Sequence, residues 1–276
     1  MSDASPTFHF ISGLPRSGST LLAALLKQNP DIHAGMSSGL GPLVNGAMQI
    51  MSPGAEAAMN LETGQRETII RNLFYSFYEG HCTCPLIFDT NRGWTARLPL
   101  LQSLFPQAKV ICCVRDVSWV MDSLERQVRK NPLHFTRLFG PQNQGNIYTR
   151  METLMQHNGL VGSAWGALKE AFYGEEAKAL LIVDYELLAR APEKVLRLIY
   201  EFIEEPWYPD HDFENVEYDA PEFDEALGIS GLHKVRAKVE FIPKRPILPP
   251  DLFQKFKDMD FWTCMDGSQA HVIGKK

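Results

Sequence analysis

The segment from Gly13 to Leu22, which reads GLPRSGSTLL, constrains the fold of this 276-residue chain more than any other part of it. It lies between an apolar run of strand length at 8–12 (FHFIS) and a helical pattern at 20–28 (TLLAALLKQ). Glycines in such a turn allow backbone N–H groups to converge, and the start of the following helix adds a partial positive charge. The sequence therefore predicts an anion-binding loop between a buried strand and a helix.

Strand-length apolar runs and helical patterns alternate along the rest of the chain. The further strand candidates are 86–89 (LIFD), 109–114 (KVICCV) and 179–184 (ALLIVD). The helical patterns lie at 64–80, 95–105, 117–130 and 192–204. This alternation predicts an α/β fold, a three-layer sandwich with a mainly parallel central sheet.

The chain is expected to form a single domain over residues 1–276. Its core is expected at about 8–205, followed by a loop-rich C-terminal extension at 206–276. The ranges 29–62 and 131–148 carry many Pro, Gly, Asn and His residues, so they are expected to form loops around the sheet.

The formal net charge of −6 narrows the range of partners. A general nucleic-acid binder needs a basic face that releases counterions, so no nucleic-acid partner is expected. No run of roughly 18 apolar residues occurs and the N-terminus lacks a basic region, so neither a membrane span nor a signal peptide is expected. Five cysteines without disulfide or zinc spacing indicate a reducing, cytoplasmic location.

The spacing of the loop matches the nucleoside-triphosphate loop G-x-x-x-x-G-K-[ST] except at one position. Ser19 replaces the lysine, and the nearest cation is Arg16, three residues earlier. That lysine normally reaches the β- and γ-phosphates, so its loss speaks against ordinary ATP or GTP hydrolysis. A plain turn with Ser19 or Thr20 as a helix N-cap is the alternative interpretation.

The segment GLPRSGSTLL resembles the 5′-phosphosulfate loop of sulfotransferases that use 3′-phosphoadenosine 5′-phosphosulfate (PAPS) and release 3′-phosphoadenosine 5′-phosphate (PAP). The resemblance implies the P-loop-like sulfotransferase fold. It also implies that Arg16 reaches the sulfonate and its bridging oxygen. The other residues expected to surround the 5′-phosphate are Pro15, Ser17, Gly18, Ser19, Thr20 and Leu21.

A second segment, CVRDVSWVMDSLERQ, resembles the strand–loop–helix that binds the 3′-phosphate in the same family. The matching residues are Arg115 at the end of a strand and Ser123 eight residues later. A guanidinium makes a forked contact with a phosphate, and a hydroxyl supplies another donor. PAPS differs from ATP in carrying the 3′-phosphate, so a dedicated site for that group would separate the two ligands.

Two weaker resemblances involve residues that follow these motifs. Residues 179–206 are similar to a family segment whose tyrosine often lies near the adenosine, which makes Tyr185 a candidate ligand. Residues 231–240 (GLHKVRAKVE) occupy the place of a late basic segment that closes over the nucleotide. Its candidate phosphate contacts are His233, Lys234, Arg236 and Lys238, and Lys238 is included among the predicted nucleotide ligands.

Neither of the residues that usually act as base in this family, a histidine after the second strand or a glutamate, is found in its expected place. Asp89, at the end of the strand candidate 86–89, is our first candidate, because a carboxylate there faces a site at the sheet edge. His33 is the second candidate. Capping of a turn by Asp89 and a surface position for His33 remain the alternatives. Arg92 is a candidate to replace a missing lysine near the sulfonate.

The predicted function is sulfonyl transfer from PAPS to a hydroxyl or amine of a small-molecule or other acceptor, with no metal required. One alternative is a P-loop kinase or NTPase, in which the aspartates that end 86–89 and 179–184 would hold Mg²⁺. The other is a non-catalytic PAP-binding protein.

The stretch 201–225 holds eleven acidic residues and no Lys or Arg. It is either a solvated flank or a segment that selects a cationic acceptor.

Overall fold

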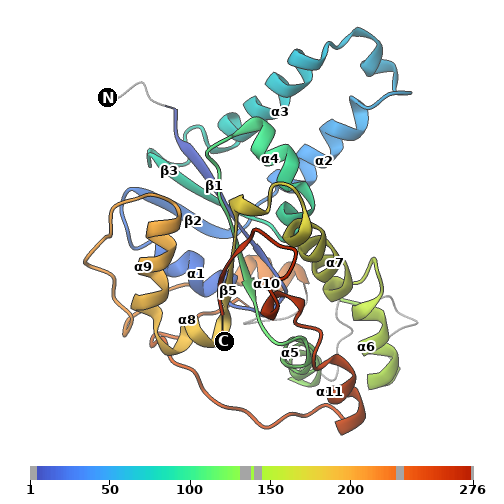
Figure 1. Cartoon of the computed structure of the whole chain (residues 1–276), viewed down its shortest axis with the longest axis vertical. Coiled ribbons are helices and arrows are strands. Elements are labelled where there is room, and N and C mark those ends of the chain that lie inside the picture. Colours follow the sequence, from blue (N-terminus) through green and yellow to red (C-terminus); the bar gives the residue numbers. More distant parts are fainter. Residues whose placement is uncertain (1–4, 131–137, 140–144, 228–232, 275–276) are drawn as a thin grey trace.

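The computed structural model describes residues 5–130, 138–139, 145–227 and 233–274. Its centre is a six-stranded sheet with helices on both faces (Figure 1). The strands are β1 (Thr7–Gly13), β2 (Ile32–Ser37), β3 (Leu86–Thr90), β4 (Val110–Val114), β5 (Leu180–Asp184) and β6 (His271–Ile273). They lie in the order β2-β3-β1-β4-β5-β6, and every neighbouring pair is parallel. The predicted α/β fold with a mainly parallel sheet is confirmed.

The helices form two outer layers. One face of the sheet carries α1 (Ser19–Leu26), α8 (Tyr185–Arg190) and α9 (Pro192–Phe202). The opposite face carries α3 (Thr63–Tyr78), α4 (Leu98–Leu104), α5 (Val117–Lys130), α6 (Ile147–Met155), α7 (Leu160–Tyr173) and α11 (Pro250–Phe256). The remaining helical elements are α2 (Leu40–Ile50), α10 (Pro221–Leu227) and the short 3₁₀ helices η1 (Glu56–Asn60), η2 (Arg92–Arg97), η4 (Ala177–Ala179) and η5 (Phe261–Thr263).

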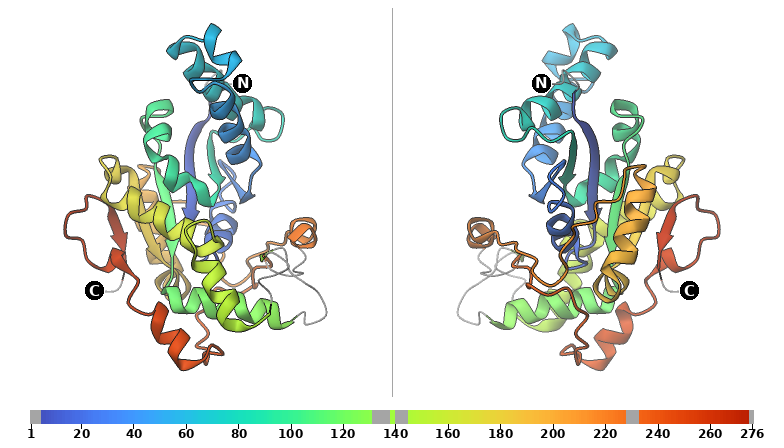
Figure 2. Two further views of the ribbon diagram at one scale, coloured as in Figure 1. Left: turned by 90° about the vertical axis from the view of Figure 1, so that its right-hand side faces the viewer. Right: turned by 90° about the vertical axis from the view of Figure 1, so that its left-hand side faces the viewer.

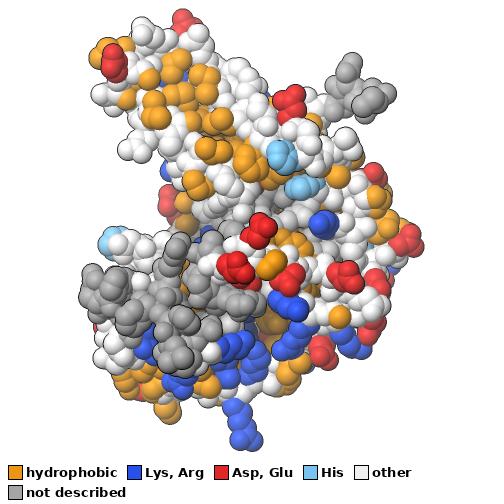
Figure 3. All heavy atoms as spheres, turned by 180° about the vertical axis from the view of Figure 1, so that it is seen from behind, with side chains coloured by type: hydrophobic (Ala, Val, Ile, Leu, Met, Phe, Trp, Pro, Cys, Tyr) orange, Lys and Arg blue, Asp and Glu red, His pale blue; other side chains and the backbone are white. Residues whose placement is uncertain are grey.

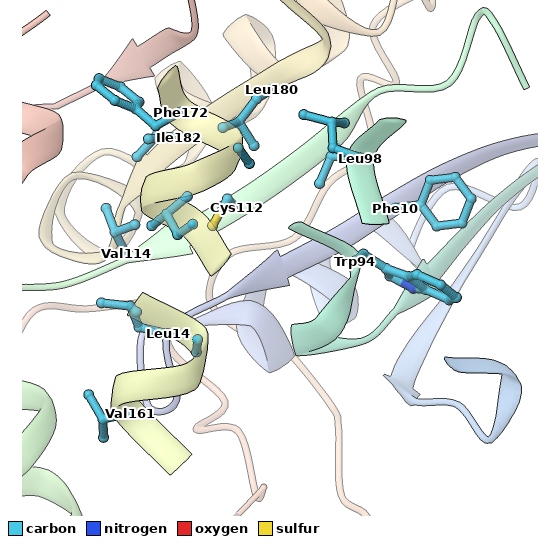
Figure 4. Close-up of a cluster of buried hydrophobic side chains, with 14 of the residues drawn as sticks. Phe10, Leu14, Trp94, Leu98, Cys112, Val114, Val161, Phe172, Leu180 and Ile182 are labelled. Atoms are coloured by element: carbon cyan, nitrogen blue, oxygen red, sulfur yellow. The ribbon is translucent and has the colours of Figure 1, made fainter. Parts of the chain in front are cut away.

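The sheet divides the hydrophobic core into two clusters, because successive strand residues point to opposite faces. Phe10 and Cys112 face the larger cluster, where Figure 4 shows Trp94 and Phe172 among the packed side chains. Ile11 and the next residue of β4, Cys113, face the cluster beneath α1 and α9. Burial on both faces explains why these strands read as continuous apolar runs.

The order of the strands creates a switch point between β1 and β4. The helix after β1, α1, packs on one face of the sheet, whereas the helix after β4, α5, packs on the other. Gly13 at the end of β1 pairs in register with Cys113 of β4. In open α/β sheets, the crevice outside the carboxyl ends of strands at such a point is where ligands bind.

The predicted elements correspond closely to the observed ones in the centre of the sheet. All four predicted strands form, as do the helices expected at 20–28, 64–80, 117–130 and 192–204. The expectation of loops throughout 29–62 was wrong, since β2 and α2 lie there. The residues of β2 (IHAGMS) carry little strand signal of their own, and pairing with β3 through Ile32 and Leu86 establishes the strand.

The helical pattern at 95–105 is divided between η2 and α4, with a proline in the first turn of α4. Of the loops predicted at 131–148, residues 131–137 and 140–144 lie outside the described residues. None of the described helices is long and apolar enough to cross a membrane.

Helices α2 and α3 form an arm that projects from the sheet, at the top of both views in Figure 2. The arm exposes several large apolar side chains, and Met59 in η1 is 81% exposed. Figure 3 shows hydrophobic side chains gathered on this arm, whereas Lys and Arg side chains gather on the lower half of the same face. The apolar and the basic surfaces are therefore separated in space.

The C-terminal residues return to the carboxyl edge of the sheet. The backbone N–H of Val216 donates to the carbonyl of Ala237 at 2.6 Å, and that of Val239 donates to Phe213 at 2.8 Å. The acidic stretch thus lies side by side with the late basic segment. Further on, the buried carboxylate of Asp122 in α5 accepts the backbone N–H groups of Ile247 (2.5 Å) and Leu248 (3.2 Å). The extension also supplies β6 to the sheet, which the sequence does not predict.

Candidate active site

The loop after β1 adopts a backbone conformation that few residues tolerate. Gly13 has a φ of 138°, and a Cβ there would lie 2.2 Å from the carbonyl oxygen of Cys113. Gly18 has a φ of 96° and lies against the ring of Tyr185. Arg16 itself has a φ of 62°, in the left-handed region that non-glycine residues rarely occupy. Such strain is typical of loops that aim backbone groups at a ligand.

Two hydrogen bonds to β4 hold this loop in place. The backbone N–H of Leu14 donates to the carbonyl of Cys113 at 3.0 Å, and the hydroxyl of Ser17 donates to the same oxygen at 2.6 Å. The Ser17 hydroxyl also contacts the carbonyl of Leu14. The predicted ligand Ser17 is buried, and its side chain holds the loop together rather than lining a cavity.

A cavity of about 620 Å³ opens at the switch point of the sheet. Its walls come from the loop after β1, the ends of β3 and β4, the start of α8 and the C-terminal segment. It brings together most of the predicted nucleotide ligands, namely Pro15, Arg16, Gly18, Ser19, Thr20, Leu21, Arg115, Ser123, Tyr185 and Lys238. Helix α1 begins at Ser19 after Gly18, without a side-chain cap, so neither Ser19 nor Thr20 caps the helix.

Arg16 and Arg115 converge in this cavity from different elements. The Nε of Arg16 donates to the hydroxyl of Ser123 in α5 at 3.4 Å. The guanidinium of Arg115 lies 4.9 Å from the ring centre of Tyr185. The Nε of Arg115 is buried and has no hydrogen-bond partner among the described residues. A buried donor without a partner costs free energy, so this atom is suited to an anionic ligand.

Lys244 is a neighbour of these arginines that the sequence did not single out. Its side chain lines the cavity, and its pKa is lowered, first by partial burial of the ammonium group and then by Arg115, Arg236, Arg126 and Arg16. Several cations therefore share one small volume, which favours a ligand with more than one negative charge. No motif marks Lys244, because it lies past the basic segment at 231–240.

Lys238 lines the cavity, but its ammonium group is already paired. Its Nζ lies 2.6 Å from Oε2 of Glu214, and both side chains are exposed. Glu214 raises the pKa of Lys238 through this contact. Lys244 is therefore better placed than Lys238 to meet a phosphate near Arg115.

Asp89, the first candidate for the base, does not line the cavity. Its side chain is fully buried and accepts hydrogen bonds from the Tyr78 hydroxyl at 2.5 Å and the Trp94 Nε1 at 2.6 Å. Burial raises the pKa of Asp89, although these donors oppose the shift. The carboxylate links β3 to α3 and η2, so we replace its predicted catalytic role with a structural one.

His33, the second candidate, also lies away from the lining residues. It belongs to β2, and its ring packs edge-on against that of Tyr78, with 5.2 Å between the two ring centres. The residues of β2 that do reach the cavity come later in the strand and include Ser37. Arg92, expected to replace a lysine, does line the cavity.

A metal site within the described residues would need several donor side chains close together. No group of three or more His, Cys, Asp or Glu side chains there is placed to hold a metal ion. The cations of the cavity are instead the arginine and lysine side chains named above.

Comparison with known proteins identifies the family of this chain. Residues 9–209 match the Sulfotransferase family, so the chain belongs to that family. Protein-tyrosine sulfotransferase 1 of Danio rerio is 27% identical over 208 residues, which cover 72% of this chain and 53% of that protein. The chain thus spans about half the length of this curated relative.

Two solved structures share the fold. The sulfotransferase domain from the curacin biosynthetic pathway is 18% identical, with a TM-score of 0.51 over 94% of this chain and 93% of that one. A sulfotransferase from Mycobacterium avium is 14% identical, with a TM-score of 0.52 over 99% of this chain and 79% of that one. The predicted sulfotransferase fold and family are therefore confirmed.

Proposed function

We propose that this protein transfers a sulfonyl group from PAPS to a hydroxyl or amine of an acceptor and releases PAP. The observation that carries the proposal is the convergence, in one cavity of a sulfotransferase-family chain, of a strained anion-binding loop and a second cationic site at Arg115. The two sites suit the two phosphate-bearing ends of one nucleotide.

Arg16 and the loop around it would hold the 5′ end of the nucleotide. The backbone N–H groups at the start of α1 are donors for a phosphate, and the helix dipole adds to their attraction. PAPS supplies an activated sulfonyl group whose departure leaves negative charge on the 5′-phosphate. The guanidinium of Arg16 would stabilise that charge as it develops.

Arg115 and Ser123 would hold the 3′-phosphate. The Nε of Arg115 has no hydrogen-bond partner in the described part of the chain, and this supports the fit because a phosphate oxygen would satisfy it. Tyr185 packs against both Gly18 and Arg115, so it connects the two phosphate sites. Lys244 would add a further contact, and Lys238 would remain paired with Glu214.

A phenol is the first acceptor class that we propose to test. The curated relatives are named protein-tyrosine sulfotransferases, whose name specifies a phenolic hydroxyl as acceptor.

Within the proposed mechanism, arginine side chains supply the positive charge near the leaving group, so we propose that transfer needs no added metal. Chelation with EDTA should leave the rate unchanged.

The two carboxylates that the kinase or NTPase alternative needs are already engaged in hydrogen bonds. Both aspartates proposed to hold Mg²⁺ have structural hydrogen bonds: Asp89 with Tyr78 and Trp94, and Asp184 with the backbone N–H of Leu187 at the start of α8. The lysine of the nucleoside-triphosphate loop is also missing, since Ser19 stands in its place.

Titration with nucleotides tests the proposal. PAP should bind more tightly than adenosine 5′-phosphate, which lacks the 3′-phosphate, and more tightly than ATP. Incubation with PAPS and the amide of N-acetyltyrosine should then yield the sulfated phenol, detected by mass spectrometry. Equal affinity for PAP and adenosine 5′-phosphate would contradict the 3′-phosphate site. Tight PAP binding with no transfer to hydroxyl or amine acceptors would favour the non-catalytic alternative.

A further inference from the structure

A histidine–aspartate pair lies at the cavity, outside the part of the chain that matches the family. Asp224, in α10, is 1% exposed, and its Oδ1 lies 2.6 Å from the Nδ1 of His233. Its Oδ2 accepts the backbone N–H of the same histidine at 3.1 Å. The carboxylate therefore fixes both the ring and the backbone of His233. The family match ends at residue 209, so it covers neither partner.

His233 lines the same cavity as Arg16 and Arg92. Both arginines influence the titration of His233, and Asp224 in turn influences Arg16, so the three groups lie within electrostatic reach. Arg16 is the residue proposed to meet the sulfonate. A base that acts on the acceptor must lie beside the sulfonate, because the acceptor oxygen attacks the sulfur.

Few other groups at the cavity can take up a proton near neutral pH. Among the described residues that line it, only His233 and Glu240 carry an imidazole or a carboxylate. Glu240 is exposed, and no hydrogen bond orients its side chain in the described part of the chain. His233 is oriented by a buried carboxylate, which is the arrangement that holds a histidine base in a defined tautomer.

We propose that His233 is the general base of the transfer and that Asp224 is the positioning residue that orients it. This inference rests on the proposed sulfonyl transfer. Nδ1–H donates to Asp224, so the Nε2 of a neutral ring accepts the proton of the acceptor hydroxyl. The acceptor oxygen then bonds to sulfur, and the bond between sulfur and the bridging oxygen breaks. Its electron pair leaves on the 5′-phosphate of PAP beside Arg16, and the proton later passes from His233 to solvent.

The surroundings of His233 favour the neutral ring that a base requires. Burial lowers its pKa below the usual value of 6.5. The hydrogen bond and charge of Asp224 raise the pKa, whereas Arg16 from the loop and Arg92 from η2 lower it. The rate should therefore rise with pH along an acidic limb below about 6.5 and then level off near neutral pH.

Two phenols of different acidity provide the sharpest test. The hydroxyl of N-acetyltyrosine amide has a pKa of about 10 and needs a base. 4-Nitrophenol is much more acidic and is mostly ionised at about pH 8, where both phenols are assayed. His233→Gln should lower kcat/KM about 10²- to 10⁴-fold with the tyrosine amide. With 4-nitrophenol the loss should be roughly 10-fold or less, because the proton has already left. PAP affinity and the thermal midpoint should remain close to those of the wild type.

Asp224→Asn tests the positioning role through the pH dependence of the rate, which a general loss of stability would not shift. The rate should fall by up to roughly 10⁴-fold, since the ring loses its orienting carboxylate. The acidic limb should also move to lower pH, because a negative charge that raises the pKa of His233 is gone. Glu222→Gln is the matched control, because Glu222 is an exposed carboxylate of the same helix that does not line the cavity, and this variant should keep both the rate and the position of the acidic limb.

The outcomes separate this inference from the proposed function. A wild type that sulfates neither these phenols nor other hydroxyl or amine acceptors would overturn sulfonyl transfer and, with it, the base. An active wild type together with a His233→Gln variant that keeps its rate on the tyrosine amide would overturn the base alone. An equal loss of kcat/KM with both phenols, with PAP affinity retained, would overturn the base and give His233 a structural role in the site. If His233→Gln does not fold, an unmoved acidic limb in Asp224→Asn overturns the pair.

Discussion

Two of the walls of the cavity are built in different ways. The loop after β1 is held by its own backbone geometry and by one carbonyl of the adjacent strand, that of Cys113. The opposite wall, residues 233–248, contains no helix or strand and depends on buried carboxylates from α5 and α10. One wall is therefore defined within a few residues of sequence, and the other only by contacts between distant parts of the chain.

This difference indicates how each wall should respond to substitution. A loop that depends on glycine geometry tolerates no added side chain, because its constraint is steric. A wall held by hydrogen bonds loses part of its function when one donor or acceptor is changed.

Gly13→Ala should destabilise the fold by roughly 4 kcal/mol or more, because its Cβ would meet a backbone oxygen in a disfavoured conformation. Thermal or denaturant unfolding would measure the loss. Gly166→Ala is the matched control, since Gly166 lies in α7 with nothing near its Cβ position. That control should keep or raise the stability by up to about 1 kcal/mol. A Gly13→Ala protein as stable as the control would contradict the steric account of the loop.

Arg16→Ala should lower kcat for sulfonyl transfer about 10²- to 10³-fold, equivalent to about 2.7–4 kcal/mol, by removing a cation from the developing charge. The measurement is turnover of PAPS with a saturating phenol. Arg197→Ala, which removes an arginine paired with Glu193 on α9, should leave turnover unchanged. Wild-type turnover in Arg16→Ala would remove Arg16 from the mechanism.

Arg115→Ala should weaken PAP binding by about 1.5–3 kcal/mol, the contribution of a hydrogen bond to a charged group. Calorimetric titration would measure this change. Affinity for adenosine 5′-phosphate should change much less, because that nucleotide lacks the 3′-phosphate. If both affinities fell equally, Arg115 would act on the loop rather than on the 3′-phosphate.

Lys244→Met should weaken PAP binding about 3- to 10-fold, the effect of one cation at a partly solvated site. Lys238→Met should change it less than about 2-fold, because its ammonium group is paired with Glu214 at an exposed position. The reverse order of effects would return the late phosphate contact to Lys238, where the sequence had placed it.

Much of the central fold was predictable because its signals are local. The strands beside β1 carry continuous apolar runs, and the spacing of Gly13, Arg16 and Gly18 specifies an anion-binding loop. By contrast, β2 has little signal of its own, and its pairing with β3 decides its conformation. Two carboxylates of the acidic stretch 201–225 have partners that the sequence does not predict: Asp224 is buried against His233, and Glu214 pairs with Lys238.

The candidate base could not be identified from the local sequence. Asp89 follows a strand toward the carboxyl edge, so its position along the chain favours an active-site role. Its orientation does not, since Tyr78 and Trp94 hold its carboxylate in the core. The basic segment 231–240 makes His233 a candidate phosphate contact in the sequence, and only the fold pairs this histidine with the buried Asp224.

The sequence by itself determined the central parallel strands, the glycine-rich loop after β1 and the two arginines that we propose for the two ends of the nucleotide. Each of these follows from steric rules or from patterns that repeat within a few residues. The tertiary structure decided which carboxylates are buried, which lysine is available to a phosphate and which histidine reaches the cavity. Those properties depend on long-range packing and on the charges that packing brings together, so no local pattern encodes them.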